Sequence, residues 1–295
     1  MRVLQLVAAG LALLAACSQA RAPDAPRALL WKVSDADNAI YLLGSFHALR
    51  ADDYPLPAPV QAAFADAASL AFEVTPAEME SPELLRQMMQ AARLSGGQKL
   101  SAVLAPSTWK RLQDYCRRNG LDANAFEPLA PWFVSLSLSL REMTRQGFDP
   151  ALGLDRHLMA EASGAGKPTS GLETAADQIR VLSGMSLDTQ RQFLEDFLDD
   201  AADPQGGTAA LHASWRRGDA AAIETRMVDE LANKYADLYR RINVDRNQAW
   251  LPQLRRMLDA AGTDDTLVVV GALHLLGKDG LVQQLQAKGY RVERL

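Results

Sequence analysis

Two histidines stand in matching positions near opposite ends of the chain. An apolar run and a glycine precede His47 in IYLLGSFHAL, residues 40–49, and the same arrangement precedes His274 in LVVVGALHLLG, residues 267–277. The 295 residues include only four histidines. Imidazole titrates near neutral pH and is the commonest side-chain metal ligand, so such positions suit proton transfer or metal binding. One Gly-x-x-His motif is most simply a loop histidine, but two copies after strong apolar runs favour a shared site.

The glycine of each motif marks the point where a predicted strand ends. Gly44 and Gly271 have no side chain, so the backbone can turn there and another group can approach closely. A side chain three residues further on projects above the carboxyl edge of the sheet, where open α/β folds bind their ligands. If the two strands are parallel neighbours, about 4.8 Å apart, both imidazoles reach one ligand. The pattern therefore predicts that His47 and His274 form one metal site.

Two carboxylates follow similar apolar segments. Glu73 lies in LAFEV, within a predicted strand that is otherwise apolar, where an unpaired charge is costly. It is predicted to be a metal ligand or a general base, and an exposed strand end or a buried salt bridge is the alternative. Glu173, in SGLET, repeats the pattern after a short strand, although capping of a helix that begins near Thr174 explains it about as well.

A long predicted helix contains Arg246 and Asn247 in NVDRNQAWL. A guanidinium near a carboxylate or a metal can hold an anionic intermediate or a substrate carboxylate, and an exposed arginine is the simpler alternative. The other two histidines, His157 and His212, follow no repeated motif. We expect them at the surface or in helix packing.

Several other kinds of chemistry lack their motifs. The sequence contains no Gly-x-Ser-x-Gly elbow, no phosphate-binding Gly-x-x-x-x-Gly-Lys loop, no His-Glu-x-x-His helix and no Cys-x-x-Cys pair. The net charge is −5, and no basic stripe is interleaved with aromatics, which argues against a nucleic-acid partner. No pattern indicates an oligomeric state.

The first 17 residues, MRVLQLVAAGLALLAAC, are typical of a secretory leader: one early positive charge, an apolar segment and a small-residue ending. The segment is short for a membrane span. Its Leu-Ala-Ala-Cys ending resembles a bacterial lipobox and makes Cys17 the predicted lipidation site, and an ordinary leader cut near Ala16 is the alternative. Ser18 follows, and resemblance to known lipoproteins then favours the outer membrane. We expect a lipid-anchored protein on the periplasmic side of the cell envelope.

A flexible Pro- and Ala-rich tether is predicted at residues 18–28, before a single domain at 29–295. Once Cys17 is set aside, Cys116 is the only cysteine, so no intramolecular disulfide is available to the domain. Cys116 lies in a charged helix without a nearby histidine, and we expect an inert thiol.

Strands are predicted at both ends of the chain. LLWKV and AIYLLG, separated by the turn formers SDADN, form a hairpin, SLAFEV adds a strand, and TLVVVG and YRVERL close the chain. Between them the spacing is mostly helical, with one short strand before Glu173. WFVSLSLSL alternates like a strand, but Pro131 before it favours a helix. The prediction is an α/β (α+β) fold, a central mixed sheet from the terminal segments with a large helical middle.

These motifs in order resemble the TraB/GumN family, which is related to the animal Tiki proteins. The resemblance covers nearly the whole mature chain, through IYLLGSFHAL, FEV, GLDRHL, GKPTSGLETAADQ, DRNQAWL and VVVGALHLLGKDGL. It implies one α/β domain built from two related halves, as in the wider group of erythromycin-esterase-like and haem-binding ChaN-like proteins. The Tiki branch is regarded as metal-dependent peptidases, which implies site roles here for His47, His274, Glu73 and Arg246.

The favoured hypothesis is a lipid-anchored, metal-dependent hydrolase, most plainly a peptidase, with a divalent ion such as Mn, Co or Zn. Glu73 would act as ligand or base and Arg246 would stabilise the developing oxyanion, with a peptide or protein as substrate. The alternative is a non-enzymatic envelope protein that binds haem, metal or peptide at the same residues.

Overall fold

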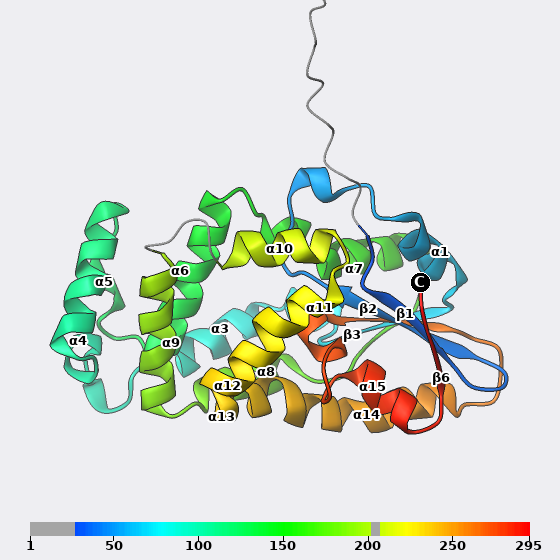
Figure 1. The fold of residues 1–295 in the computed structure, drawn as a ribbon. Coiled ribbons are helices and arrows are strands. Elements are labelled where there is room, and N and C mark those ends of the chain that lie inside the picture. The colour runs from blue at the N-terminus through cyan, green and yellow to red at the C-terminus, as the bar shows by residue number, and fades with distance from the viewer. Residues whose placement is uncertain (1–26, 202–206) are drawn as a thin grey trace, which may run out of the picture.

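A six-stranded mixed sheet, formed by the described residues, joins the two ends of the chain (Figure 1). The computed structural model describes residues 27–201 and 207–295, so the predicted leader, Cys17 and most of the tether lie outside the described residues. The strands are β1 (Leu30–Ser34), β2 (Ala39–Ser45), β3 (Ser69–Phe72), β4 (Thr169–Gly171), β5 (Thr266–Gly271) and β6 (Arg291–Arg294). Their order across the sheet is β4-β3-β5-β2-β1-β6.

The four strands from β4 to β2 are parallel, whereas β1 pairs antiparallel with β2 and with β6. Every residue of β2 is buried, and so are the last five residues of β5, as expected of parallel strands that are covered on both faces. The predicted hairpin of β1 and β2 is confirmed, and the Asp35 carboxylate accepts the backbone N–H of Asn38 in its turn.

Helices fill the middle of the chain, as predicted. They are α1 (Ala58–Asp66), α2 (Pro76–Met79), α3 (Pro82–Ala91), α4 (Leu100–Val103), α5 (Pro106–Arg118), α6 (Pro131–Arg145), α7 (Leu154–Ala165), α8 (Ala175–Ser183), α9 (Leu187–Asp200), α10 (Thr208–Arg216), α11 (Ala220–Ile223), α12 (Glu230–Lys234), α13 (Ala236–Tyr239), α14 (Asp245–Leu258) and α15 (Leu281–Ala287). The ambiguous WFVSLSLSL segment is helical in α6, with Pro131 at the first position of the helix, where a missing N–H costs nothing.

The helices form two regions. In Figure 1, α14 and α15 lie on one side of the sheet, and α1, α7 and α10 lie on the other. Helices α4, α5, α6 and α9 stand beside the sheet and share a separate apolar core that includes Leu112, Leu138 and Leu194. Across the described ranges, no helix is both long and apolar enough to cross a membrane. The fold is therefore α+β, with a helical subregion beside one edge of the sheet.

Candidate functional site

The two Gly-x-x-His motifs meet because β2 and β5 are adjacent and parallel. Their register pairs Gly44 with Val270 and Ser45 with Gly271, so the motifs are offset by one residue along the strands. His47 follows β2, and His274 lies in the 3₁₀ turn Ala272–Leu275 that follows β5. The structure thus brings both histidines to the carboxyl edge of the same sheet.

Gly271 lies at the centre of this cluster. A Cβ at this position would lie 3.3 Å from Glu73 Oε1 and 3.3 Å from His47 Nε2, and 3.7 Å from His274 Cδ2. Its N–H donates to Glu73 Oε1 at 2.8 Å. The close approach of these atoms requires the glycine. Its backbone conformation does not, because a φ of −52° is open to any residue. Gly44 has a different role, because a Cβ there would lie 3.0 Å from Leu29 Cβ and would disturb packing.

Glu73 is the first residue after β3 and not part of the strand, which corrects the prediction from the sequence. Ladder pairing with β4 ends at Phe72 and Gly171. Beyond it, Leu172 N–H donates to Phe72 O at 2.8 Å, and Glu173 N–H donates to Glu73 O at 2.9 Å. This bond sets the two glutamates side by side. Because Glu73 lies just beyond the strand, its side chain reaches Arg246 and the Gly271 N–H.

The Glu73 carboxylate has a partner on each oxygen. Oε2 accepts from Arg246 Nη2 at 2.6 Å and from Gln178 Nε2 at 2.9 Å, and Oε1 accepts from the Gly271 N–H. Burial alone would raise the pKa of Glu73, but the charges around it, chiefly that of Arg246, outweigh burial and lower the pKa to about 2. Glu73 is therefore ionised at neutral pH.

Arg246, in the first turn of α14, holds the cluster together. Its Nε and Nη2 donate to the Glu173 carboxylate, and its Nη2 also donates to Glu73. Its Nη1 donates to Ile242 O at 3.0 Å and lies 2.9 Å from His274 Nε2. The guanidinium also stacks 4.7 Å from the centre of the Trp250 ring. The arginine is fully paired and only 14% of its side chain is exposed, which overturns the exposed alternative.

Glu173 does not cap a helix. Thr174 is the N-cap of α8, in a capping box with Asp177, and the Glu173 carboxylate pairs with Arg246 instead. Arg246 follows the π-helical turn Arg240–Val244, a distortion often found at functional sites.

The hydrogen bonds of His274 fix its tautomer. Asn247 Nδ2 donates to the backbone oxygens of His274 and Asp279, so its Oδ1 faces the imidazole and accepts from His274 Nδ1 at 2.7 Å. The lone pair of Nε2 is then free to accept from Arg246. Burial lowers the pKa of His274 to about 3, so this histidine is neutral.

His47 is held by Asp155 at the start of α7. His47 Nδ1 lies 2.8 Å from Asp155 Oδ2, and a carboxylate there raises the pKa of the imidazole. Since 67% of the His47 side chain is exposed, water screens this attraction. With Nδ1 held by the carboxylate, Nε2 is the nitrogen that faces Gly271.

The structure also places residues that the sequence analysis did not select. Asp155 belongs to the GLDRHL motif and contacts His47, and Gln178 contacts Glu73; neither residue has a local pattern that indicates these partners. His157 lies apart, beside Glu161, and packs on Tyr54. Two further residues that were not expected at the site lie in packing positions. His212 is buried against Asp53, and Cys116 is buried in α5, where burial raises the pKa of its thiol.

The donor atoms suit a divalent metal in their type and orientation. His47 Nε2 and Glu73 Oε1 lie beside Gly271, and His274 Nε2 lies 3.9 Å from Glu73 Oε1. Each imidazole is oriented through Nδ1 by an acceptor, as metal-binding histidines usually are. Within residues 27–201 and 207–295, however, no group of three or more His, Cys, Asp or Glu is already arranged as a ligand set. Arg246 occupies the lone pair of His274, so a metal must displace that one contact.

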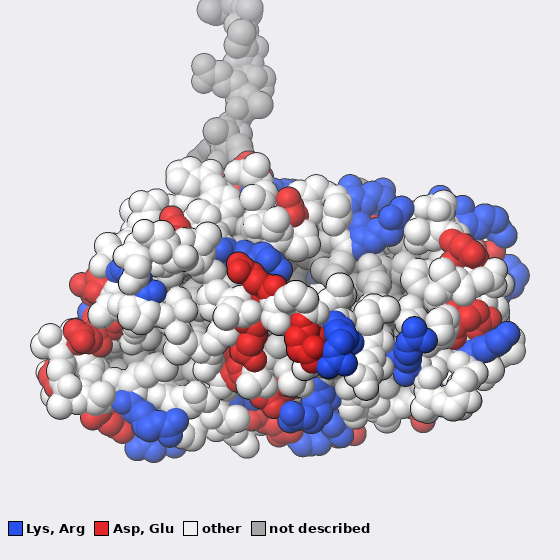
Figure 2. Space-filling model, turned by 180° about the vertical axis from the view of Figure 1, so that it is seen from behind, with Lys and Arg blue, Asp and Glu red and all other residues white. Residues whose placement is uncertain are grey.

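Two cavities adjoin the cluster of histidines, glutamates and Arg246. One of about 530 Å³ is lined by His47, Glu73 and Arg246, and a second of about 390 Å³ is lined by Glu173 and also by Arg246. On the molecular face in Figure 2, acidic and basic side chains lie interspersed. Arg246 therefore lines both of these cavities.

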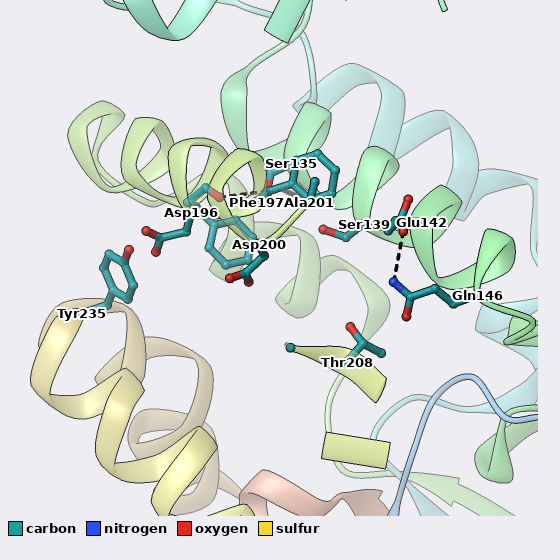
Figure 3. A pocket seen from close by; sticks show the side chains of 12 residues that line it. Ser135, Ser139, Glu142, Gln146, Asp196, Phe197, Asp200, Ala201, Thr208 and Tyr235 are labelled. Atoms are coloured by element: carbon teal, nitrogen blue, oxygen red, sulfur yellow. Dashed lines mark hydrogen bonds between the residues drawn. The ribbon is translucent and has the colours of Figure 1, made fainter. Parts of the chain in front are cut away.

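A third cavity, of about 270 Å³, lies between α6, α9 and the start of α10 (Figure 3). Its described lining includes neither histidine nor cysteine. Glu142 accepts there from Arg145 and Gln146, and Asp196 pairs with Lys234. This cavity is separate from the histidine cluster.

Two adjacent parallel strands of the mixed sheet each lead into a Gly-x-x-His motif, beside an arginine that two glutamates hold. These features define an α+β protein with a polar centre at the carboxyl edge of its sheet. The chain belongs to the TraB/PrgY/gumN family, whose model matches residues 29–294. It is 24% identical over 246 residues to "Uncharacterized protein YbaP" of Escherichia coli (strain K12), covering 83% of this chain and 87% of that protein. The Shigella flexneri protein of the same name matches with the same values. No solved structure matches significantly.

Proposed function

We propose that this protein is a metal-dependent hydrolase that acts on peptides at the cell envelope. The observation that supports this proposal best is that Glu73 Oε1 lies beside Gly271 together with His47 Nε2 and lies 3.9 Å from His274 Nε2. His47, His274 and Glu73 would hold a divalent ion such as Mn, Co or Zn. A divalent ion supplies Lewis acidity there, which polarises a carbonyl and acidifies water.

The residues around the proposed metal site would have different roles. With a pKa of about 2, Glu73 is a weak base at neutral pH, and so it suits ligation better than proton abstraction. Asp155 and Asn247 fix the two imidazole rings through Nδ1. Arg246 lines the cavity and keeps its charge, which places a cation beside any developing oxyanion or substrate carboxylate.

A second candidate function is binding without catalysis, of a peptide, a metal or haem. The observation that favours it is that every guanidinium nitrogen of Arg246 already has a partner. These partners are Glu73, Glu173, Ile242 O and His274. A guanidinium so fully paired stabilises the protein and has no donor free for a transition state.

The envelope location rests on residues 1–18. The charge, the apolar segment and Cys17 support a lipid-anchored protein on the periplasmic side, and Ser18 favours the outer membrane. A lipid anchor would bring the polar centre to substrates of that compartment.

Incubation of the purified protein with a peptide library, with and without Mn²⁺, tests the hydrolase. We expect cleavage that Mn²⁺ supports, that EDTA abolishes and that His47→Ala loses. His157→Ala is the matched control, because this histidine lies outside the cluster. Absence of cleavage by the folded, Mn²⁺-loaded protein, or cleavage that survives both EDTA and His47→Ala, would contradict the proposal.

A further inference from the structure

The cavity beside the histidines is mainly apolar. Nine of its fifteen lining residues are apolar, and three of these are methionines: Met79, Met88 and Met159. The remaining lining residues include His47, Glu73 and Arg246, so the apolar wall and the polar centre share one space. Its volume of about 530 Å³ is within the range of ligand-binding pockets.

The methionines come from three separate elements, α2, α3 and α7, and all are partly exposed. Helix α3 has no buried residue, and on it Leu85 is 66% exposed and Met89 is 38% exposed. These are two of the four large exposed apolar side chains among the described residues. Leu85 and Met89 do not line the cavity, but they show that helix α3 leaves apolar side chains open to solvent next to it.

We propose that this cavity binds one large, unbranched apolar side chain of an extended peptide, next to the bond that the polar centre acts on. The inference rests on the proposed hydrolase function. Thioethers are flexible and polarisable, and they adapt to long aliphatic chains. Arg156 also lines the cavity and is exposed, so the peptide's polar groups meet charge beside the apolar wall. A peptide offers both kinds of group at once.

The test uses labelled hexapeptides with norleucine, leucine, aspartate or glycine at one position among alanines. Binding is followed by fluorescence anisotropy without added metal, and cleavage is followed with Mn²⁺. We expect norleucine to be preferred over aspartate and glycine by at least about tenfold in both, because apolar pockets discriminate at this level for even one methylene. Norleucine should equal or exceed leucine.

Met88→Gln is the probing variant and Met89→Gln its matched control, since the neighbouring Met89 does not line the cavity. Met88→Gln should abolish the norleucine preference through Kd and KM with kcat little changed, and Met89→Gln should keep the preference. Met159→Gln repeats the test on another helix if Met88→Gln lowers the melting temperature.

The outcomes separate the two proposals. Selective binding that Met88→Gln removes, without cleavage of any peptide, supports the cavity and contradicts the hydrolase. Cleavage with no side-chain preference, or failure to bind any of the peptides, overturns the cavity proposal. Displacement of the norleucine peptide by haemin at equal concentration would also overturn it, by assigning the cavity to haem.

Discussion

His47 and His274 leave the same edge of the sheet because β2 and β5 are adjacent and parallel in a register that pairs Ser45 with Gly271. Both Nδ1 atoms are held by acceptors, Asp155 for one ring and Asn247 for the other. The result is a pair of oriented imidazoles beside the ionised carboxylate of Glu73.

Gly271→Ala should damage the site and spare the fold. Its Cβ would lie 3.3 Å from Glu73 Oε1 and His47 Nε2, so both donors must shift, while the φ of −52° suits alanine. We expect a loss of Mn²⁺ affinity with a change of less than about 1 kcal/mol in unfolding free energy, measured by calorimetric titration and urea unfolding. Gly44→Ala is the contrasting variant: its Cβ would meet Leu29 at 3.0 Å, and overpacking should cost about 1–3 kcal/mol. Equal effects of the two variants on stability would contradict this assignment.

Glu73→Gln should destabilise the protein in a pH-dependent way. The folded pKa of about 2 lies below the ordinary value of 4.5, so ionised Glu73 stabilises the fold fully above pH 4.5, and this contribution is lost as the pH falls toward 2. The stability difference between wild type and variant should be on the order of 2 kcal/mol at pH 6 and should shrink in acid, by urea unfolding. Glu83→Gln, in an exposed pair with Arg86, is the control and should change little. A difference that stays constant from pH 6 to 3 would show that the carboxylate charge is not responsible.

Asp155→Asn should lower the pKa of His47. The carboxylate raises this pKa in the wild type, so its removal brings the value back toward 6.5. Proton NMR of the imidazole in metal-free protein measures the shift, with His157 as an internal reference. Mn²⁺ affinity should fall about 10–100-fold, as is usual when a residue that orients a metal ligand is lost. An unchanged His47 titration would remove Asp155 from the account.

Cys17→Ser should release a folded protein from the membrane. Cys17 lies outside the described residues, and the prediction rests on the leader pattern, in which acyl chains provide the anchor. Fractionation of cells and circular dichroism of the soluble variant check it. A variant that stays membrane-bound after a high-salt wash would require another mode of attachment.

The sequence was informative where local pattern determines structure. Apolar runs identified β2 and β5, and a proline at the helix start identified α6 despite its strand-like alternation. The pairing of Arg246 was not predictable, because a guanidinium finds its carboxylates through the tertiary fold, here across β3, β4 and α14. Asp155 was missed for the same reason: its partner His47 lies on another element.

Glu73 combines the two roles that its sequence context suggests separately. A buried salt bridge and a functional carboxylate stood as competing explanations, yet Oε2 pairs with Arg246 while Oε1 faces the histidines. The two oxygens of this carboxylate contact different partners, and the sequence alone does not show which oxygen contacts which partner.

The central claim is that His47 and His274 serve one metal site, and a double-mutant cycle of Mn²⁺ affinity tests it most directly. Calorimetric titration of wild type, His47→Ala, His274→Ala and the double variant gives the four affinities, with His157→Ala as control. Two ligands of one ion are not independent, so each single variant should lose most of the affinity and the double variant little more. Additive losses, or a wild-type protein that binds no Mn²⁺, would contradict the account.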